Sequence, residues 1–193
     1  MGFKPWMDAT AADWIATSSV PWDSLVGFGP AGFESHGRLR FIPDPAYPGQ
    51  SENEAAPGSG QLSETQQLEI ALTILRRHTT TPDELFMAFW DGFGFAMPAA
   101  GFDVPNRSYF LYRGRASAAG AWEIAPGDQA AGQRWMPAPA FIWPADHAWC
   151  LAKDVDPHWA GIGASGLAVA DLLAEHRLDV VAANPLERQP WYS

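Results

Sequence analysis

Hydrophobic and polar residues alternate along several stretches of this chain, as they do in β-strands. In residues 33–42, FESHGRLRFI, one face carries the apolar side chains of Phe33, Leu39 and Phe41. The opposite face carries Glu34, His36, Arg38 and Arg40. We therefore expect a half-buried strand there, with its charged face in water at the edge of a sheet.

Two further stretches are apolar on both faces. Residues 85–91, LFMAFWD, and residues 108–113, SYFLYR, place large aliphatic or aromatic side chains at successive positions. A strand of this kind belongs inside a sheet that is covered on both sides. Because turn residues separate the two stretches, we predict that they lie side by side and antiparallel. Shorter runs predict strands at 147–154 and 178–183.

Helical spacing is clearest in residues 64–77, where apolar side chains recur every three or four positions. Ser63 and Gln66 suit a capping box at the start of this helix. Two shorter helices are predicted, at 8–17 behind Asp8 and at 166–176 behind Ser165. Pro21 is expected to prevent the first of them from continuing.

Together these elements predict one α+β domain over residues 1–193, with a mainly antiparallel sheet and two or three helices packed against it. Strands outnumber helices, and their order does not alternate as it does in a doubly wound parallel sheet. The segment 43–60, PDPAYPGQSENEAAPGSG, is rich in Pro, Gly and polar residues. This composition predicts a mobile surface loop.

The chain is acidic, with 12 Lys and Arg against 22 Asp and Glu and a formal net charge of -10. This charge would repel a phosphate backbone, so we expect no nucleic-acid ligand. It favours encounter with a protein partner that has a basic surface, and it also serves solubility. No stretch approaches the roughly 18 apolar residues that cross a bilayer, so no membrane contact is predicted. The single cysteine, Cys150, and the absence of a secretory leader favour a cytoplasmic location.

The segment 161–166, GIGASG, has the glycine spacing of a dinucleotide-binding turn. The preceding strand is expected to end near Asp154, and only about thirty residues follow the motif, which is too few for the rest of a dinucleotide fold. We therefore interpret it as a flexible turn before a capped helix. No nicotinamide, flavin or other cofactor is expected.

Three side chains with metal-ligand chemistry alternate near this motif, namely Asp154, Asp156 and His158. Pro157 interrupts the strand that would present them on one face, and such a sequence is typical of a turn. We therefore predict no metal site. His147 and Cys150 lie three residues apart on a predicted strand and point to opposite faces, so they form no nucleophile and base pair. Cys150 is expected to be buried and inert.

Two groups of residues are candidates for ligand binding. His36, Arg38 and Arg40 gather basic side chains that could hold an anion, although a solvated strand face is the favoured explanation. Trp143 and Trp159, with His147 as a polar group, could line an aromatic pocket. A Trp-rich core accounts for the same ten tryptophans, and in that core we predict that Trp90 and Trp149 are largely buried.

The segments HTTTPDELFMAFWDGFG at 78–94 and WPADHAWCLAKDVDPHWAGIGAS at 143–165 resemble the shared blocks of an uncharacterised, Trp-rich actinobacterial family. With SYFLYRG and the closing helix, the resemblance covers about 60–183. It implies no activity, cofactor or catalytic residue. The arrangement of segments is also similar to that of the SUKH immunity superfamily, whose α+β members bind and neutralise polymorphic toxins.

Two functions remain open from the sequence. A non-catalytic binding protein, such as a protein-interaction or immunity-like module, is favoured by the missing catalytic constellation, the abundant Trp and the acidic charge. The alternative is an enzyme or small-molecule sensor with a Trp-lined pocket. Its polar groups would be His147, His158, Asp154 or Asp156.

Overall fold

The structure is a computed structural model, and it describes residues 3–55, 62–94, 98–115 and 138–193. In these ranges one sheet has the strand order β1-β5-β3-β6-β7-β8-β2-β9, with β4 paired to β5. Each pairing recorded between these strands is antiparallel. The strands are β1 (Lys4–Pro5), β2 (Ser35–Arg40), β3 (Leu85–Trp90), β4 (Gly101–Val104), β5 (Arg107–Gly114), β6 (Phe141–Pro144), β7 (Cys150–Ala152), β8 (Trp159–Ala164) and β9 (Val180–Ala182).

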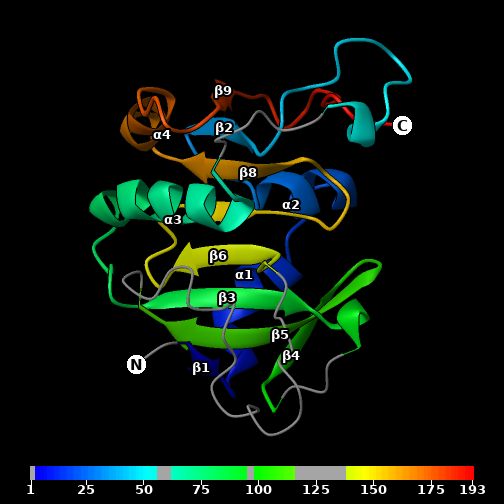
Figure 1. The fold of residues 1–193 in the computed structure, drawn as a ribbon. Helices are drawn as coiled ribbons and strands as arrows, with labels where there is room; N and C mark the ends of the chain where they lie inside the picture. The colour runs from blue at the N-terminus through cyan, green and yellow to red at the C-terminus, as the bar shows by residue number, and fades with distance from the viewer. Residues whose placement is uncertain (1–2, 56–61, 95–97, 116–137) are drawn as a thin grey trace, which may run out of the picture.

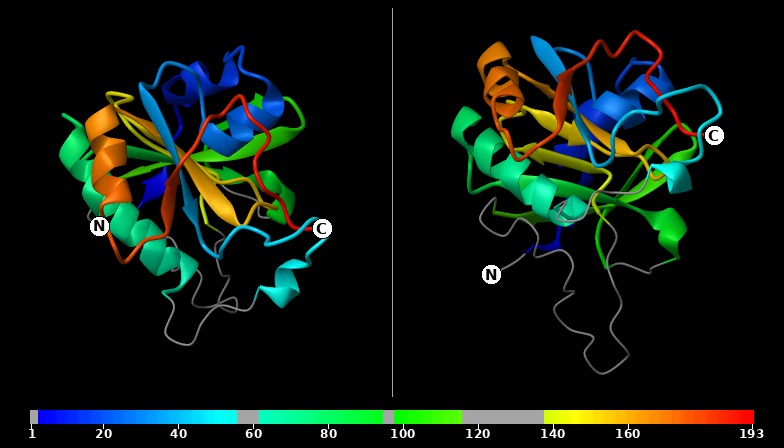
Figure 2. Two further views of the ribbon diagram at one scale, coloured as in Figure 1. Left: turned by 90° about the horizontal axis from the view of Figure 1, so that it is seen from above. Right: turned by 45° about the horizontal axis from the view of Figure 1, so that its top comes forward.

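Helices lie on both faces of this sheet. In Figure 1, α3 lies in front of the sheet and α1 behind it, and Figure 2 shows α3 and α4 side by side. The described α-helices are α1 (Asp13–Ala16), α2 (Trp22–Phe28), α3 (Glu64–Leu75) and α4 (Gly166–Leu173). Short 3-10 turns are η1 (Ala9–Ala12), η2 (Glu52–Glu54), η3 (Arg76–His78) and η4 (Asp91–Phe93). The α+β prediction is confirmed, although four α-helices form where two or three were expected.

The two-sided strand at the centre of the sheet divides the core in two. Leu85, Met87 and Phe89 of β3 point into the core beneath α3 and α4. Phe86 and Ala88 point into the core beneath α1 and α2. Because β3 is paired with β5 on one side and β6 on the other, its prediction as an interior strand antiparallel to β5 is confirmed.

Side-chain caps start two helices where the sequence predicted them. Ser63 accepts a hydrogen bond from Gln66 N, and the Gln66 side chain accepts one from Ser63 N, which completes the capping box of α3. Ser165 accepts from Ala168 N at 3.2 Å at the start of α4. Asp8 likewise accepts from Thr10 N ahead of η1 and α1.

One helix was missed because Pro21 was interpreted only as a stop. Proline cannot continue a helix from its interior, but it is compatible with a helix start, where no earlier carbonyl needs its N–H. Pro21 is the N-cap residue of α2, and Leu25 and Val26 then enter the core under the sheet.

The expectation of an edge strand at 33–42 is wrong. β2 is paired to β8 on one side and to β9 on the other. The short final strand therefore covers the edge that the sequence assigned to water. Arg38 is also only 5% exposed, although its strand face was predicted to be solvated, because Asp44 and the Trp159 ring lie against its guanidinium.

The predicted strand at 147–154 is shortened to β7, and the glycine motif is not a turn. His147 has a left-handed φ of 55°, so regular pairing starts only at Cys150. Gly161 and Gly163 lie inside β8 instead. A side chain at Gly161 would overlap the Gly27 carbonyl of α2, and one at Gly163 would overlap the Phe33 ring. These glycines therefore allow α2 and the Phe33 ring to pack closely against β8.

The burial of the tryptophans differs in part from the prediction. Trp149 is fully buried as expected, whereas Trp90 is only partly buried at the end of β3. Trp143 and Trp159, named as candidates for lining a pocket, lie in β6 and β8 at 0% and 5% exposure. Trp122 and Trp135 fall outside the described residues, as do residues 56–61 of the segment predicted to be mobile.

Candidate functional site

A cluster of charged side chains lies where the chain leaves β2. Asp44 is its centre: Arg38 donates to both of its carboxylate oxygens at 2.7 and 2.9 Å, and Arg40 donates to one of them at 2.9 Å. Arg40 also donates to Asp179, ahead of β9, at 2.6 Å. Only 6% of the Arg38 side chain and 21% of the Asp44 side chain are exposed, so this bidentate pair is largely, but not fully, shielded from water.

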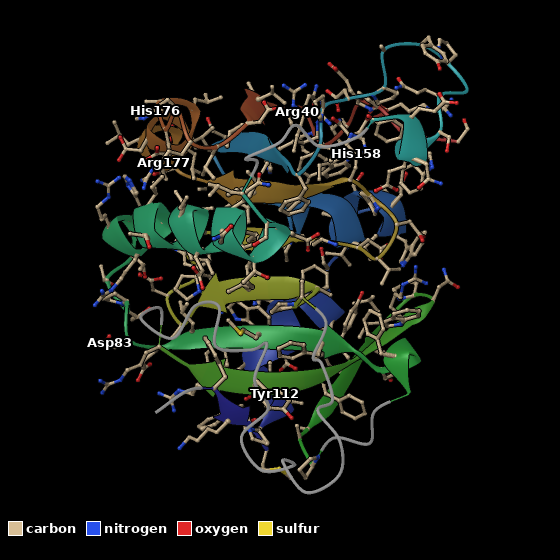
Figure 3. The ribbon with its side chains drawn as sticks, in the orientation of Figure 1. Arg40, Asp83, Tyr112, His158, His176 and Arg177 are labelled. Atoms are coloured by element: carbon tan, nitrogen blue, oxygen red, sulfur yellow. The ribbon has the colours of Figure 1, made fainter. Side chains whose placement is uncertain are left out.

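His158 joins the cluster from the residue before β8. Its Nε2 lies 3.1 Å from the Asp44 carboxylate, and the Tyr192 ring packs edge-on against the imidazole. Burial alone raises the pKa of Asp44, but hydrogen bonds from Arg38, His158 and Arg40 outweigh it and hold this pKa well below its ordinary value. Figure 3 shows Arg40 and His158 at the same end of the molecule.

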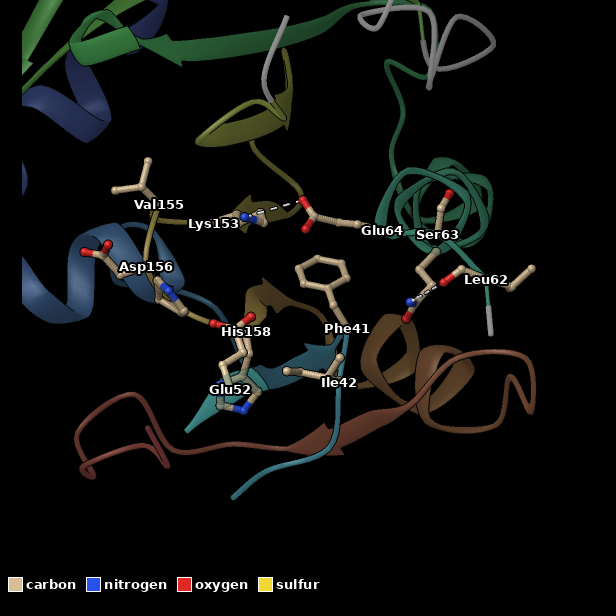
Figure 4. Close-up of a pocket in the computed structure, with 12 residues that line it drawn as sticks. Phe41, Ile42, Glu52, Leu62, Ser63, Glu64, Lys153, Val155, Asp156 and His158 are labelled. Atoms are coloured by element: carbon tan, nitrogen blue, oxygen red, sulfur yellow. Dashed lines mark hydrogen bonds and ion pairs between the residues drawn. The ribbon is translucent and has the colours of Figure 1, made fainter. Parts of the chain in front are cut away.

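A cleft of about 480 Å³ opens beside this cluster (Figure 4). Its walls come from the end of β2, the start of α3, η2 and the segment between β7 and β8. This volume lies in the range of ligand-binding cavities. A neighbouring cavity of about 390 Å³ shares Glu52, Asp156 and His158 with the cleft, so the two hollows have one wall in common.

The side chains that line the cleft carry more negative than positive charge. Glu52, Glu64 and Asp156 contribute three carboxylates, against the single ammonium of Lys153. Lys153 Nζ lies 3.4 Å from Glu64 and 5.7 Å from the centroid of the Phe41 ring. Figure 4 shows Lys153 and Glu64 facing one another beside that ring. The carboxylates of Glu52 and Asp156, both exposed residues, therefore leave the cleft negative.

The residues predicted to hold an anion are distributed between two environments. Arg38 and Arg40 already bind carboxylates of the chain itself, in Asp44 and Asp179. His36 lies apart from them, packed edge-on against the rings of Phe28 and Phe33, and burial lowers its pKa. The structure therefore neutralises the two arginines internally.

The residues predicted to line an aromatic pocket are also separated. Trp143 is in the core, where it meets the edge of Trp14, and His147 stacks on the same Trp14 ring with centroids 4.1 Å apart. Trp159 lies elsewhere, beneath the Arg38 guanidinium. Trp159 does border a cavity of about 630 Å³, together with Phe28, Leu186 and Trp191.

The three residues considered as metal ligands have different partners. Asp154 pairs with Arg107, whose guanidinium lies over the Trp22 and Trp90 rings. His158 is held by Asp44, and Asp156 lines the cleft. In the part of the chain that the structure describes, no three His, Cys, Asp or Glu side chains are grouped so that they could hold a metal ion.

Cys150 is buried on the α2 side of the sheet, as expected. Burial raises the pKa of its thiol, and its neighbours there include the backbone at Gly29. Because the thiolate is the reactive form, this environment makes Cys150 unsuited to nucleophilic chemistry.

Sequence reasoning missed most of the cleft. Its polar residues Glu52, Glu64, Gln67, Lys153 and Asp156 come from three separate segments, so no local spacing connects them. One signal was present for Asp44: a carboxylate in a Pro-flanked turn, a few residues after a strand with two arginines, is well placed to fold back on them.

The fold and the cleft define an α+β protein with a mostly antiparallel sheet and an acidic surface hollow. Compared with protein families, curated proteins and solved structures, the chain has no match in any of the three. Among the helices of the described ranges, none has the length and apolar character needed to cross a membrane.

Proposed function

We propose that this protein is a non-catalytic binding protein that receives a basic protein partner at the acidic cleft beside α3. The observation that carries the proposal is the excess of carboxylates at Glu52, Glu64 and Asp156 over the single Lys153. Such a surface attracts cationic groups and repels phosphate, so it favours a basic protein over nucleic acid. The net charge of -10 acts in the same direction over the whole molecule.

The reactive side chains are either hydrogen-bonded to other residues or buried, which supports a non-catalytic role. His158 is bound to Asp44 and has 2% of its side chain exposed, which makes it poorly accessible as a general base. Cys150 is fully buried. These two residues therefore contribute to the packing of the fold, and the cleft offers a recognition surface.

The proposal includes an immunity-like role, in which the basic partner is a toxin. A toxin with a basic surface is a partner that the cleft would suit, and the similarity in segment arrangement to the SUKH superfamily points in that direction. Encounter with such a toxin would take place in the cytoplasm.

Affinity capture with paired variants tests the proposal. The double variant Glu52→Gln and Asp156→Asn removes two cleft charges, and Asp13→Asn with Asp103→Asn removes two exposed charges on α1 and β4 as a matched control. We expect a basic protein to be retained by the wild type and the control and lost by the cleft variant, as quantified by mass spectrometry. Equal retention by both variants would contradict the cleft as the binding surface.

A second candidate function rests on the cavity of about 630 Å³ that Trp159 and Trp191 border. Indole rings beside Asp23 and Arg188 could bind a small molecule, which would make the protein a sensor or an enzyme. A thermal-shift screen over metabolites would reveal such a ligand, because binding to the native state raises the melting temperature. A hit whose shift disappears in Trp191→Ala would favour this function.

A further inference from the structure

We propose that the cavity of about 630 Å³ beside α2 is a binding site for a neutral saccharide, with one sugar ring stacked on Trp191. This inference rests on the second candidate function, since it names the chemical class of the small molecule. It does not depend on the acidic cleft, because the two hollows share no lining residue.

The cavity lies between the sheet and the segment that follows β9. α2 and the first residue of β8 form one wall, and residues within 185–191 form the other. Figure 2 shows this segment, in red, passing α2 on its way to the end of the chain. It is held on both sides of the cavity: Ser24 donates to the Pro185 carbonyl at 3.0 Å, and Tyr192 donates to the Pro43 carbonyl at 2.6 Å. The outer wall is therefore anchored at both ends.

Aromatic and aliphatic side chains on the two walls suit the apolar face of a ring. Phe28 and Trp159 of the inner wall are 3% and 5% exposed. Leu186 and Trp191 of the outer wall are 85% and 53% exposed. Large apolar side chains left in water around a hollow with a polar rim are typical of a binding surface. The indole of Trp191 is thus available to stack on the C–H face of a sugar.

A buried donor in the inner wall is the second observation. Nε1 of Trp159 is buried and has no hydrogen-bond acceptor among the residues that the structure describes. Other buried indoles have the same property, but they do not line this cavity. A buried N–H without an acceptor costs free energy, and a ligand hydroxyl that accepts from it removes the cost. The site therefore favours a ligand that brings oxygen acceptors.

The rim of the cavity offers both kinds of hydrogen-bonding group. The carboxylates of Asp23 and Glu187 accept, and the exposed guanidinium of Arg188 donates. Each hydroxyl of a sugar is both a donor and an acceptor, so the edge of a sugar ring can use all three side chains.

The charges around the cavity disfavour an ionic ligand. The rim mixes two carboxylates with one guanidinium, so neither sign has a clear advantage there. Against a cation, the Arg38 guanidinium already lies 5.5 Å from the centroid of the Trp159 ring. Against an anion, the whole chain carries a net charge of -10. A neutral ligand with an apolar face and a polyhydroxyl edge meets these conditions, and a saccharide has both features.

The test is a ¹H–¹⁵N NMR titration of the intact protein that follows the indole N–H signals. The probes are the methyl glycosides of glucose, galactose, mannose and N-acetylglucosamine. We expect at least one of them to bind with a Kd on the order of 1 mM, as suits a single ring. It should shift the signals of Trp159 and Trp191, with the Trp159 proton moving downfield as it forms a hydrogen bond.

Four comparison probes separate the saccharide from other ligands. Cyclohexanemethanol keeps an apolar ring with one hydroxyl, adenine is a flat neutral ring, choline is a cation and gluconate is an anion. Each should bind at least about tenfold more weakly than the best glycoside. The free sugars, titrated in parallel, distinguish a site for a monosaccharide from one for the end of a glycan, since only the former gains from the free anomeric hydroxyl. Either of these results supports the site.

Variants test the individual contacts. Trp191→Ala should weaken the best glycoside at least about tenfold, and Arg188→Met about fivefold, because they remove the stacking surface and a donor. Trp159→Phe keeps an aromatic ring without the N–H and should weaken it several-fold. The matched control is Leu167→Ala with Arg177→Met, which changes two exposed side chains on and after α4 and should leave binding unchanged. If Trp159→Phe fails to fold, the two exposed variants still decide.

Binding of cyclohexanemethanol as tight as that of the best glycoside, or glycoside binding that Trp191→Ala leaves intact, would overturn the saccharide site. If adenine, choline or gluconate shifts the Trp159 and Trp191 signals and no glycoside does, the saccharide class is wrong and the small-molecule function stands. If no probe shifts these signals, the saccharide site is wrong, and partner capture still decides on the acidic cleft. If a glycoside binds while partner capture fails, the saccharide site stands and the function proposed for the cleft fails.

Discussion

Replacing Asp44 by Asn should destabilise the protein more than any other single change of a charged residue in the cluster around β2. The substitution keeps the shape of the side chain and removes the charge that Arg38, Arg40 and His158 share. Arg38 has 6% of its side chain exposed, so its guanidinium would stay buried beside a neutral amide. Losing one partner of a buried pair costs about 3 to 5 kcal/mol.

Two features set the expected value toward the lower end of this range. The Asp44 side chain is 21% exposed, so water can replace part of the lost interaction. Arg40 keeps its second partner, Asp179. We therefore expect a loss of about 3 kcal/mol in the free energy of unfolding, a large share of the about 5 to 15 kcal/mol that a domain has in total.

Urea denaturation followed by tryptophan fluorescence measures this loss. Asp179→Asn is the matched control, because it also removes a carboxylate from Arg40 but one that is 43% exposed, and it should cost less than about 1 kcal/mol. If Asp44→Asn costs no more than Asp179→Asn at an unchanged m-value, the cluster does not hold the fold together and the reasoning is refuted.

The remaining predictions concern pH, the core and a helix cap. The pKa of Asp44 is held below its ordinary value and the pKa of Asp146 is lowered to about 2, so both stabilise the fold above the ordinary aspartate pKa of about 4. The free energy of unfolding should therefore decrease as the pH falls below about 4. The difference in this free energy between the wild type and Asp44→Asn should become smaller over the same pH range. A difference that stays constant down to pH 2 would count against the role of the cluster. Trp149→Ala should cost about 3 to 5 kcal/mol and abolish soluble expression, while Trp90→Ala, at a partly exposed site, should cost clearly less by thermal melting. Ser165→Ala should cost about 1 kcal/mol, since it removes the cap bond to Ala168 N.

Much of the fold could be predicted because its signals are local. The capping box of Ser63 and Gln66 and the two-sided run at 85–91 depend only on neighbouring residues, and both give the elements that they predict. Predictions for the shorter elements were wrong where pairing with a distant segment decides the position of a strand in the sheet. β2 was assigned to an edge because nothing in residues 33–42 shows that β9, about 140 residues later, will pair with it.

The prediction of a turn at the glycine motif was wrong for a related reason. Gly161 and Gly163 were interpreted through the turn that such spacing forms in another fold. In this one, the backbone of α2 and the Phe33 ring come so close to β8 that a side chain at either position would overlap them. Glycine has two uses, unusual backbone angles and close approach, and the sequence does not distinguish them.

The cleft could not be predicted because its walls come from segments far apart in the sequence, which contacts such as that between Asp44 and His158 bring together. Asp44 turns back onto Arg38 and Arg40 and holds His158, which brings the loop after β2 against the segment before β8. That contact neutralises the basic residues of the strand, so the cationic face seen in the sequence disappears. Glu52 and Asp156, which follow and precede the joined residues, are then left on the wall of the cleft. With the arginines of β2 neutralised and carboxylates on the cleft wall, the surface beside the cluster is acidic, and for this reason the partner that we propose is basic.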